Sequence, residues 1–265
     1  MAIAFAGPGK PLTTEALKEA GDIVGIPENA LWAVLHVESS GAGFQSDRRP
    51  KILFERHKFH RATGGSFDAT HPGISNPSPG GYGAGGAHQY DRLAEALKLD
   101  RRAALESASW GLGQVLGSNF AVAGYDDVED MVARMVQSER QQLLAMFNFI
   151  DGNNLGKALR KGDWLSFALG YNGANAEANG YPNKLKGAFD AFEAGSPPDI
   201  RVRIAQLGLT FLGHAPGGVD GVFGGNTRRA LQRFEASVGL PQTDLLSDAA
   251  FDALVEKAFG GSLDD

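Results

Sequence analysis

A short helical pattern runs through residues 26–38, Ile26-Pro-Glu-Asn-Ala-Leu-Trp-Ala-Val-Leu-His-Val-Glu38, and ends just before Ser39-Ser40-Gly41. Positions i, i+3, i+4 and i+7 of a helix share one face, and here they hold Leu31, Val34, Leu35 and Glu38. The apolar neighbours predict that this face is buried, where a carboxylate is costly unless it is paired or protonated. Because desolvation raises the pKa of a glutamate, such a group can serve as a general acid near neutral pH. The alternative is a helix-end glutamate that faces solvent or forms an ion pair.

The composition of the chain limits its possible functions. With 265 residues and 43% hydrophobic content, the chain can bury one large core or two unequal domains. The net charge of −6 argues against an electrostatic nucleic-acid binder, so we expect no nucleic-acid partner. There is no cysteine, which excludes disulfides and thiolate metal sites.

Two further features concern membranes and export. The first residues, Met1-Ala-Ile-Ala-Phe-Ala-Gly7, are too few for a signal peptide and lack its basic start. Nowhere is there an apolar run long enough to span a bilayer. We therefore expect no stable membrane insertion and synthesis without an export signal in this chain.

Most of the first 195 residues have helical spacing. The clearest long helix is predicted over residues 126–149, whose apolar positions are Val128, Met131, Val132, Met135, Leu143, Met146 and Phe147. A further pattern is centred on residues 112–123, and residues 71–86 form a loop rich in proline, glycine and serine. This loop is either a flap over a cleft or a linker.

A short stiff break, Gly195-Ser-Pro-Pro198, divides the chain. Beyond it, three short helices are predicted over residues 200–212, 227–238 and 247–258. We therefore predict a mainly α protein with a larger domain at residues 1–195 and a smaller one at residues 199–262.

Two more motifs follow Glu38 along the chain. They are Ser107-Ala-Ser-Trp-Gly-Leu-Gly-Gln-Val-Leu-Gly117 and Phe167-Ala-Leu-Gly-Tyr-Asn-Gly173. The order Glu-Ser, Gly-Leu-x-Gln, Tyr-Asn-Gly resembles the superfamily of soluble lytic transglycosylases and goose-type lysozymes. Together with Ser109-Trp-Gly111 and residues 164–173, the segment Phe54-Glu-Arg-His57 looks more closely like the N-acetylmuramidase domains of bacteriophage endolysins. The resemblance covers roughly residues 10–193.

The resemblance implies cleavage of the β-1,4 bond between N-acetylmuramic acid and N-acetylglucosamine. This reaction needs an acid for the leaving oxygen and stabilisation of an oxocarbenium-like centre. By the resemblance, Glu38 is the acid and Gln114 lies on the cleft floor. Tyr171 and Asn172 would line the opposite wall, and Ser109 is a further substrate-binding candidate.

Several of these residues also have a purely structural interpretation. Gln114 could tie two loops together, and Tyr171 could be a core aromatic with a satisfied hydroxyl. Asn172 could cap the helix that ends before Gly173. Among the aromatic residues, Tyr82 in the glycine-rich loop is expected to be exposed for stacking on sugar, whereas Trp110 between small residues is more typical of a core.

Hydrolysis also needs a second carboxylate, as a base for water or as a nucleophile. The candidates are Glu55, Asp68, Asp91 and Glu106. We choose Glu55 because it lies in the muramidase-like segment; the alternative is an ion pair with Arg56 or Arg61. Without a second carboxylate, the 6-hydroxyl of the sugar can close on the anomeric carbon, and the enzyme would be a lytic transglycosylase. No His-Glu-x-x-His motif is present, so we expect neither a metal site nor another cofactor.

The C-terminal region contains Val219-Asp-Gly-Val-Phe-Gly-Gly-Asn-Thr-Arg-Arg-Ala-Leu-Gln-Arg-Phe234. This stretch resembles the peptidoglycan-binding domain type 1, a three-helix module. Gly221 and Gly224 suit its tight turn, and Thr227 is predicted to be the N-cap of the next helix. The sequence departs from the family pattern at Glu235, where glutamine is usual, and at residues 245–249, where a second turn motif is missing. The alternative is therefore a helical cap without a ligand.

Together these patterns predict an endolysin with a lysozyme-like helical domain and a small three-helix peptidoglycan-binding domain. Its expected partner is the glycan strand of bacterial peptidoglycan, and we expect a monomer. By the resemblance, the protein would accumulate in the host cytoplasm and reach the wall after another protein permeabilises the membrane. The alternatives are a lytic transglycosylase that forms 1,6-anhydro products and a non-catalytic wall-binding structural protein.

Overall fold

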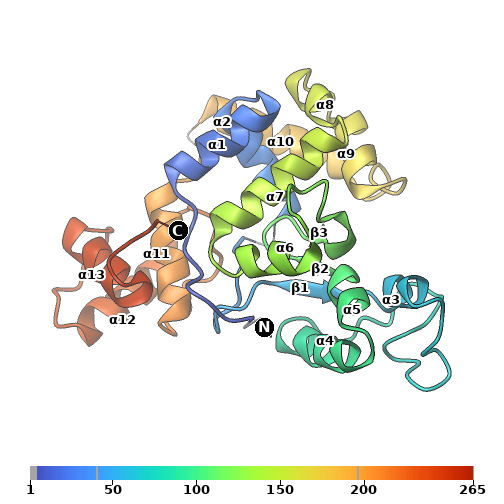
Figure 1. Cartoon of the computed structure of the whole chain (residues 1–265). Coiled ribbons are helices and arrows are strands. Elements are labelled where there is room, and N and C mark those ends of the chain that lie inside the picture. Colours follow the sequence, from blue (N-terminus) through green and yellow to red (C-terminus); the bar gives the residue numbers. More distant parts are fainter. Residues whose placement is uncertain (1–4, 40, 196, 265) are drawn as a thin grey trace.

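The computed structural model describes residues 5–39, 41–195 and 197–264 (Figure 1). Residues 1–4, Ser40, Ser196 and Asp265 lie outside the described residues, and they include parts of the Met1–Gly7, Ser39–Gly41 and Gly195–Pro198 segments. The described part is mainly helical, as the sequence predicted, and it also contains one small three-stranded sheet that the sequence did not predict. Within it, no helix combines the length and the apolar character needed to cross a bilayer.

Helix α1 spans Thr14–Val24 and leads into α2, which spans Glu28–Glu38. The start of α1 is capped by Thr13, whose side chain accepts a hydrogen bond from the Ala16 amide, and Gly25 ends the helix in a left-handed conformation. Helix α2 is buried on all sides from Ala30 to Leu35, rather than along one face as predicted. The reason is that α1 and α10 (Tyr181–Ala194) both pack against it.

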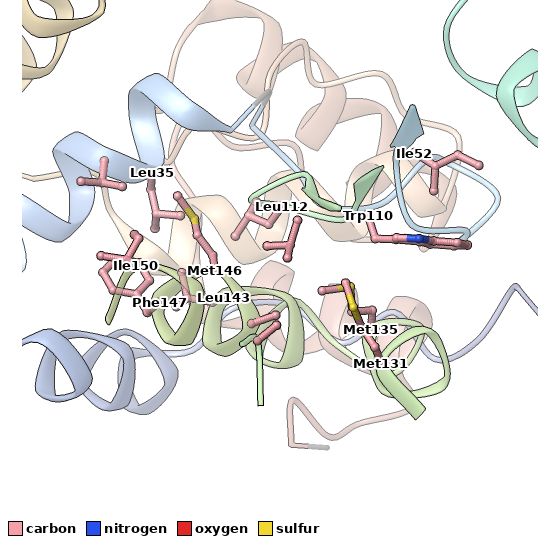
Figure 2. Packing of buried hydrophobic residues seen from close by; sticks show 14 of the residues in the cluster. Leu35, Ile52, Trp110, Leu112, Met131, Met135, Leu143, Met146, Phe147 and Ile150 are labelled. Atoms are coloured by element: carbon pink, nitrogen blue, oxygen red, sulfur yellow. The ribbon is translucent and has the colours of Figure 1, made fainter. Parts of the chain in front are cut away.

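The single long helix predicted over residues 126–149 is wrong. The chain forms α6, Val128–Met135, and α7, Glu139–Gly152, with a break at Ser138. The Ser138 side chain caps α7, and its backbone pairs with Lys10 from the N-terminal segment. The apolar spacing hides this break because both helices bury the same side, and Figure 2 shows their methionine side chains reaching one core.

The sheet consists of β1 (Ile52–Phe54), β2 (Ala108–Trp110) and β3 (Val115–Leu116), all antiparallel in this order. The helical pattern expected over residues 112–123 is therefore wrong, since β3 and a 3-10 helix, η1 (Gly117–Asn119), occupy it. The turn between β2 and β3 needs positive φ angles, 68° at Gly111 and 48° at Gln114. Trp110 is fully buried, as its small neighbours predicted.

The remaining helices of the larger part are α3 (Arg56–Ala62), α4 (Ala87–Leu99), α5 (Arg101–Glu106), α8 (Gly156–Arg160) and α9 (Trp164–Asn172). The predicted loop over residues 71–86 lies between α3 and α4 and is anchored to α4. Gln89 donates to the carbonyls of Tyr82 and Ala84 at 2.8 and 2.7 Å. Arg92 donates to the carbonyls of Gly81 and Gly73.

The C-terminal module consists of α11 (Ile200–Phe211), α12 (Gly225–Ser237) and α13 (Asp248–Phe259). The three helices share an apolar cluster that includes Leu209, Leu231, Phe234 and Leu254. The N-cap of α12 is Gly224, so the prediction that Thr227 caps this helix is wrong. The Thr227 hydroxyl is buried instead and accepts a hydrogen bond from Gln206, which also binds the turn before α12.

The module packs against the larger part, beside the N-terminal segment and α7 (Figure 1). A buried ion pair joins Arg203 of α11 to Glu139 of α7. Lys10 adds two hydrogen bonds from the N-terminal segment to the carbonyls of Phe259 and Ser262. The domain limits at residues 1–195 and 199–262 stay a prediction; α10 ends at Ala194 and α11 begins at Ile200.

Candidate active site

A groove of about 860 Å³ collects most of the residues that the sequence singled out. Its walls come from the end of α2, the start of α3, the loop before α4, the β2–β3 turn and helices α9 and α10. The predicted site residues that line it are Glu38, Glu55, Tyr82, Gln114, Tyr171 and Asn172. The fold therefore brings together six side chains from distant parts of the chain.

Glu38 lies in the last turn of α2 and is half-buried. Its Oε2 accepts a hydrogen bond of 2.7 Å from the Asn172 side-chain amide, whereas its Oε1 is buried without a hydrogen-bond partner. Burial raises the pKa of Glu38 above its ordinary value, and the Asn172 hydrogen bond and the charge of Lys184 oppose this rise in part. The negative end of the α2 dipole acts in the same direction as burial. Glu38 therefore retains its proton at higher pH than an exposed glutamate.

Asn172 is the last residue of α9, and Gly173 with φ 85° is the residue that caps this helix. The Asn172 side chain extends toward α2 and Glu38. Its Oδ1 is buried and, like Oε1 of Glu38, has no hydrogen-bond partner. Two buried oxygen atoms without hydrogen-bond partners thus occur on contacting residues of one groove, where a ligand can supply the partners.

Tyr171 combines both of the interpretations that the sequence left open. Its ring stacks on Phe167 with centroids 5.5 Å apart, and its hydroxyl donates to the Gly113 carbonyl at 2.9 Å. Burial raises the pKa of the hydroxyl well above its ordinary value, so it stays protonated. The residue is thus tied to the core and to the β2–β3 turn while it lines the groove.

Gln114 adopts a left-handed backbone, with φ 48°, that is strained for a residue other than glycine. Such conformations cost about 1–3 kcal/mol and cluster at ligand sites. The amide nitrogen donates to the carbonyls of Gly111 at 2.7 Å and Lys51 at 3.2 Å. Gln114 therefore ties two loops together, and its amide oxygen is the group left to face a ligand.

Glu55 precedes α3 and comes from a separate element of the same groove. Among the described residues its ionisable neighbour is His57, with Nε2 3.7 Å from Oε2, rather than Arg56 or Arg61. The Ser109 hydroxyl lies 3.5 Å from its Oε1. Ser109 itself is buried and is not part of the groove lining, so it contacts Glu55 rather than open space.

Two other candidates for the second carboxylate are engaged away from the groove. Asp68 accepts one hydrogen bond from the Ser75 hydroxyl at 2.5 Å, and its Oδ2 is hydrogen-bonded to Nδ1 of His60 at 2.8 Å. Glu106 forms an ion pair with Arg102 on the same helix face. Neither lines the groove, and Asp91 does not line it either. In the described part of the chain, no cluster of three or more histidine or acidic side chains is arranged to hold a metal ion.

The sequence did not single out His57 and Lys184 as site residues. His57 lines the groove, and burial lowers the pKa of its imidazole, with the Glu55 carboxylate opposing the shift. Its place in the Phe54-Glu-Arg-His57 segment was the available signal. Lys184 gave no local signal, since it acts on Glu38 only because α10 packs against α2.

Comparison with known proteins supplies independent information. The N-acetylmuramidase family matches residues 27–193. A peptidoglycan binding domain family matches residues 199–254. Among solved structures, the crystal structure of the Burkholderia AP3 phage endolysin is similar, with a TM-score of 0.66 and 40% sequence identity over 70% of this chain and 72% of that chain. Comparison with curated proteins gives no match.

Proposed function

The chain belongs to the N-acetylmuramidase family and is a peptidoglycan hydrolase with a peptidoglycan-binding domain, and from this premise we propose that Glu38 is its general acid. The endolysin resemblance, the mainly helical fold and the glycoside hydrolase class predicted from the sequence are confirmed. The enzyme acts on the bacterial cell wall. What remains is to assign the chemistry to side chains.

One observation carries the assignment of Glu38: a buried carboxyl oxygen without a partner in a sugar-sized groove. A general acid must hold its proton at the working pH and release it to the leaving oxygen. Burial supports the first requirement because it raises the pKa of Glu38. The free Oε1 supports the second, since no protein group competes with the glycosidic oxygen for it.

We assign Glu55 as the base that activates water in a single displacement at the anomeric carbon. Its contacts support this role, because a neutral His57 beside it does not neutralise the carboxylate. Ser109 would orient Glu55 rather than touch the sugar. If Glu55 does not activate water, the transglycosylase alternative applies, in which the 6-hydroxyl of the sugar replaces water.

The other groove residues would hold the glycan strand. Asn172 offers its free Oδ1 to an amide N–H such as that of an N-acetyl group, and Gln114 offers its amide oxygen. Tyr82 is half-buried rather than fully exposed, yet its ring lines the groove and can stack on a sugar. Tyr171 forms the wall behind Asn172.

The C-terminal module would anchor the enzyme to peptidoglycan, its expected partner. We further propose that the chain acts as a monomer without nucleic acid. In this proposal it is made in the host cytoplasm and reaches the wall after the membrane has been permeabilised.

The test compares the unaltered enzyme with Glu38→Gln on purified peptidoglycan, followed by mass spectrometry of the soluble products. Unaltered enzyme should release fragments with reducing ends, and Glu38→Gln should lose nearly all activity while its circular dichroism spectrum is unchanged. Glu106→Gln is the matched control, since Glu106 is an acid paired with Arg102 outside the groove. Ordinary activity in folded Glu38→Gln would refute the assignment, and 1,6-anhydro products would favour the transglycosylase.

A further inference from the structure

A buried ion pair between Arg203 and Glu139 connects the C-terminal module to the larger domain. Arg203 lies in α11 and is 3% exposed, and Glu139 lies in the first turn of α7 and is fully buried. The guanidinium donates to both carboxylate oxygens, at 2.5 and 2.9 Å. Because two desolvated charges are tolerated only when their remaining hydrogen-bonding atoms are also satisfied, the other contacts of the pair are informative.

Two of those other contacts are made with the segment 41–43, which follows α2 in the chain. Arg203 donates to the Gly41 carbonyl at 2.9 Å. Glu139 accepts a hydrogen bond of 2.8 Å from the Gly43 amide, and one of 3.1 Å from the Leu12 amide. Gly41 is only three positions after Glu38 in the chain. The ion pair therefore holds both ends of the segment 41–43.

The segment fits closely between the two domains. Gly41 has φ 84°, and a Cβ atom there would lie 3.1 Å from the Val219 carbonyl oxygen of the module. At Gly43, a Cβ atom would lie 1.8 Å from Oε1 of Gln142 in α7. Ala42, between them, is buried in an apolar cluster with residues of α11 and α13. The module is thus one wall of the space that this segment occupies.

Hydrogen bonds also connect the surroundings of this segment to the groove. Gln142, which packs against Gly43, accepts a hydrogen bond from the Leu112 amide at 2.9 Å. The carbonyl of the next residue, Gly113, accepts a hydrogen bond from the Tyr171 hydroxyl. A cavity of about 250 Å³, lined by residues that include Trp32, Leu35 and Arg203, lies between α2 and the module. Beside this cavity, the polar contacts of Arg203 add to the apolar cluster around Ala42 in connecting the module to the segment 41–43.

We propose that Arg203 is a positioning residue for Glu38, so that the peptidoglycan-binding module completes the active site as well as anchoring the enzyme. The inference rests on the proposed role of Glu38 as the acid. Without the contacts of Arg203, the segment 41–43 loses its hydrogen bond to the module and keeps only apolar contacts with it. The end of α2 then loosens, and water reaches Oε1 of Glu38.

A second consequence concerns pH. Among the described residues, the titratable groups around Glu38 come from four places. They are Tyr171 of α9, Lys184 and Tyr181 of α10, Glu55, His57 and Lys58 at the start of α3, and Tyr82 of the loop before α4. A substitution at Arg203 leaves all of them in place. Hydration of Glu38 would weaken the burial that raises its pKa, so the alkaline limb of the kcat profile should move to lower pH. A module that only anchors the enzyme would not move this limb.

The experiment uses the full-length chain and soluble, uncross-linked glycan fragments, which need no anchoring to a wall. The variants are Arg203→Met, Arg203→Lys and, as a matched control at the same domain boundary, Lys10→Ala. Lys10 binds the end of the module through Phe259 and Ser262 but does not contact the segment 41–43 through its side chain. For each variant, kcat, KM and the pH dependence of kcat are measured.

Arg203→Met should lower kcat by about tenfold or more, because small displacements of a catalytic group have effects of this size. KM should change little, the alkaline limb should move down, and Arg203→Lys should restore part of the rate. Lys10→Ala should behave as the unaltered chain. A folded Arg203→Met with unaltered kcat and pH profile would overturn the proposal.

Two further variants keep the outcomes separate. If Arg203→Met does not fold, the double variant Glu139→Gln with Arg203→Met removes the unpaired charge, and unaltered kcat in that variant would overturn the proposal equally. Glu38→Gln is assayed on the same fragments. Its activity would refute the proposed function itself, whereas an inactive Glu38→Gln beside fully active Arg203 variants would refute only the coupling.

Discussion

The buried ion pair between Arg203 and Glu139 leads to a quantitative prediction about stability. Arg203→Met removes two hydrogen bonds to the carboxylate and one to the Gly41 carbonyl, and it leaves the fully buried Glu139 without its counter-charge. Removing one partner of a buried pair costs about 3–5 kcal/mol of unfolding free energy. For a chain of this size, that corresponds to a fall in Tm of roughly 10 °C.

The double-mutant cycle tests the reasoning more sharply. Glu139→Gln alone should cost a similar amount, since it leaves the guanidinium buried. The double variant buries no charge, so its cost should be close to that of one single variant rather than to their sum. The summed costs of the two single variants should therefore exceed the cost of the double variant by about 3 kcal/mol. A coupling of this size lies at the upper end of measured pair couplings.

An exposed ion pair in the same chain serves as the control. Arg102 and Glu106 pair at 2.7 Å across one turn of α5, with the arginine side chain 75% exposed. Arg102→Met should lower the free energy of unfolding far less than Arg203→Met does, because exposed pairs are screened by water. Urea unfolding followed by tryptophan fluorescence measures all four changes. Arg203 and Glu139 are not a coupled buried pair if Arg203→Met is no more destabilising than Arg102→Met, or if the costs of the two single variants simply add.

Three other predictions concern the groove residues Asn172 and Glu38 and the nearby Gly43. Asn172→Leu should move the alkaline limb of the kcat profile to higher pH, because the Asn172 hydrogen bond holds the pKa of Glu38 down; a shift to lower pH would contradict this assignment. Glu38→Gln should raise Tm at neutral pH. Because the pKa of Glu38 is higher in the folded than in the unfolded chain, Glu38 stabilises the fold fully below the unfolded pKa and loses this contribution as the pH rises through the folded pKa. The gain in Tm from Glu38→Gln should therefore vanish in acid. Calorimetry at several pH values measures it. Gly43→Ala should destabilise the chain by about 1–3 kcal/mol, because its methyl group collides with Gln142, whereas Gly73→Ala, with open space around it, should be nearly neutral in urea unfolding.

Local signals in the sequence predicted the elements that depend on local chemistry. Thr13 and Gly25 delimit α1 because a side-chain cap and a left-handed glycine act within one helical turn. The break at Ser138 escaped prediction because the apolar spacing continues across it, and the N-terminal segment that pairs there is remote in sequence. After Trp110, the positive φ angles of Gly111 and Gln114 produce a turn where the sequence predicted a helix. An apolar pattern contains no information about such backbone angles.

The candidate site shows the same division. Glu38, Gln114 and the Tyr171-Asn172 pair could be selected because each belongs to a short motif, and Glu55 because its segment is similar to a muramidase pattern. The hydrogen bond between Asn172 and Glu38 joins residues 134 positions apart, and no periodicity indicates it. The influence of Lys184 on Glu38 likewise depends on the packing of α10 against α2.

By itself, the amino-acid sequence determined the helical class and the likeness to peptidoglycan hydrolases, and it led us to propose Glu38 as the proton donor. These depend on residue type and spacing, which the chain carries at every point. The tertiary structure alone decided how strongly that acid is shielded, which amide holds it, and that Arg203 and Glu139 bind the segment beside it. Shielding and pairing arise when surfaces distant in the chain exclude water from each other, and this depends on how the helices pack rather than on any one stretch of sequence.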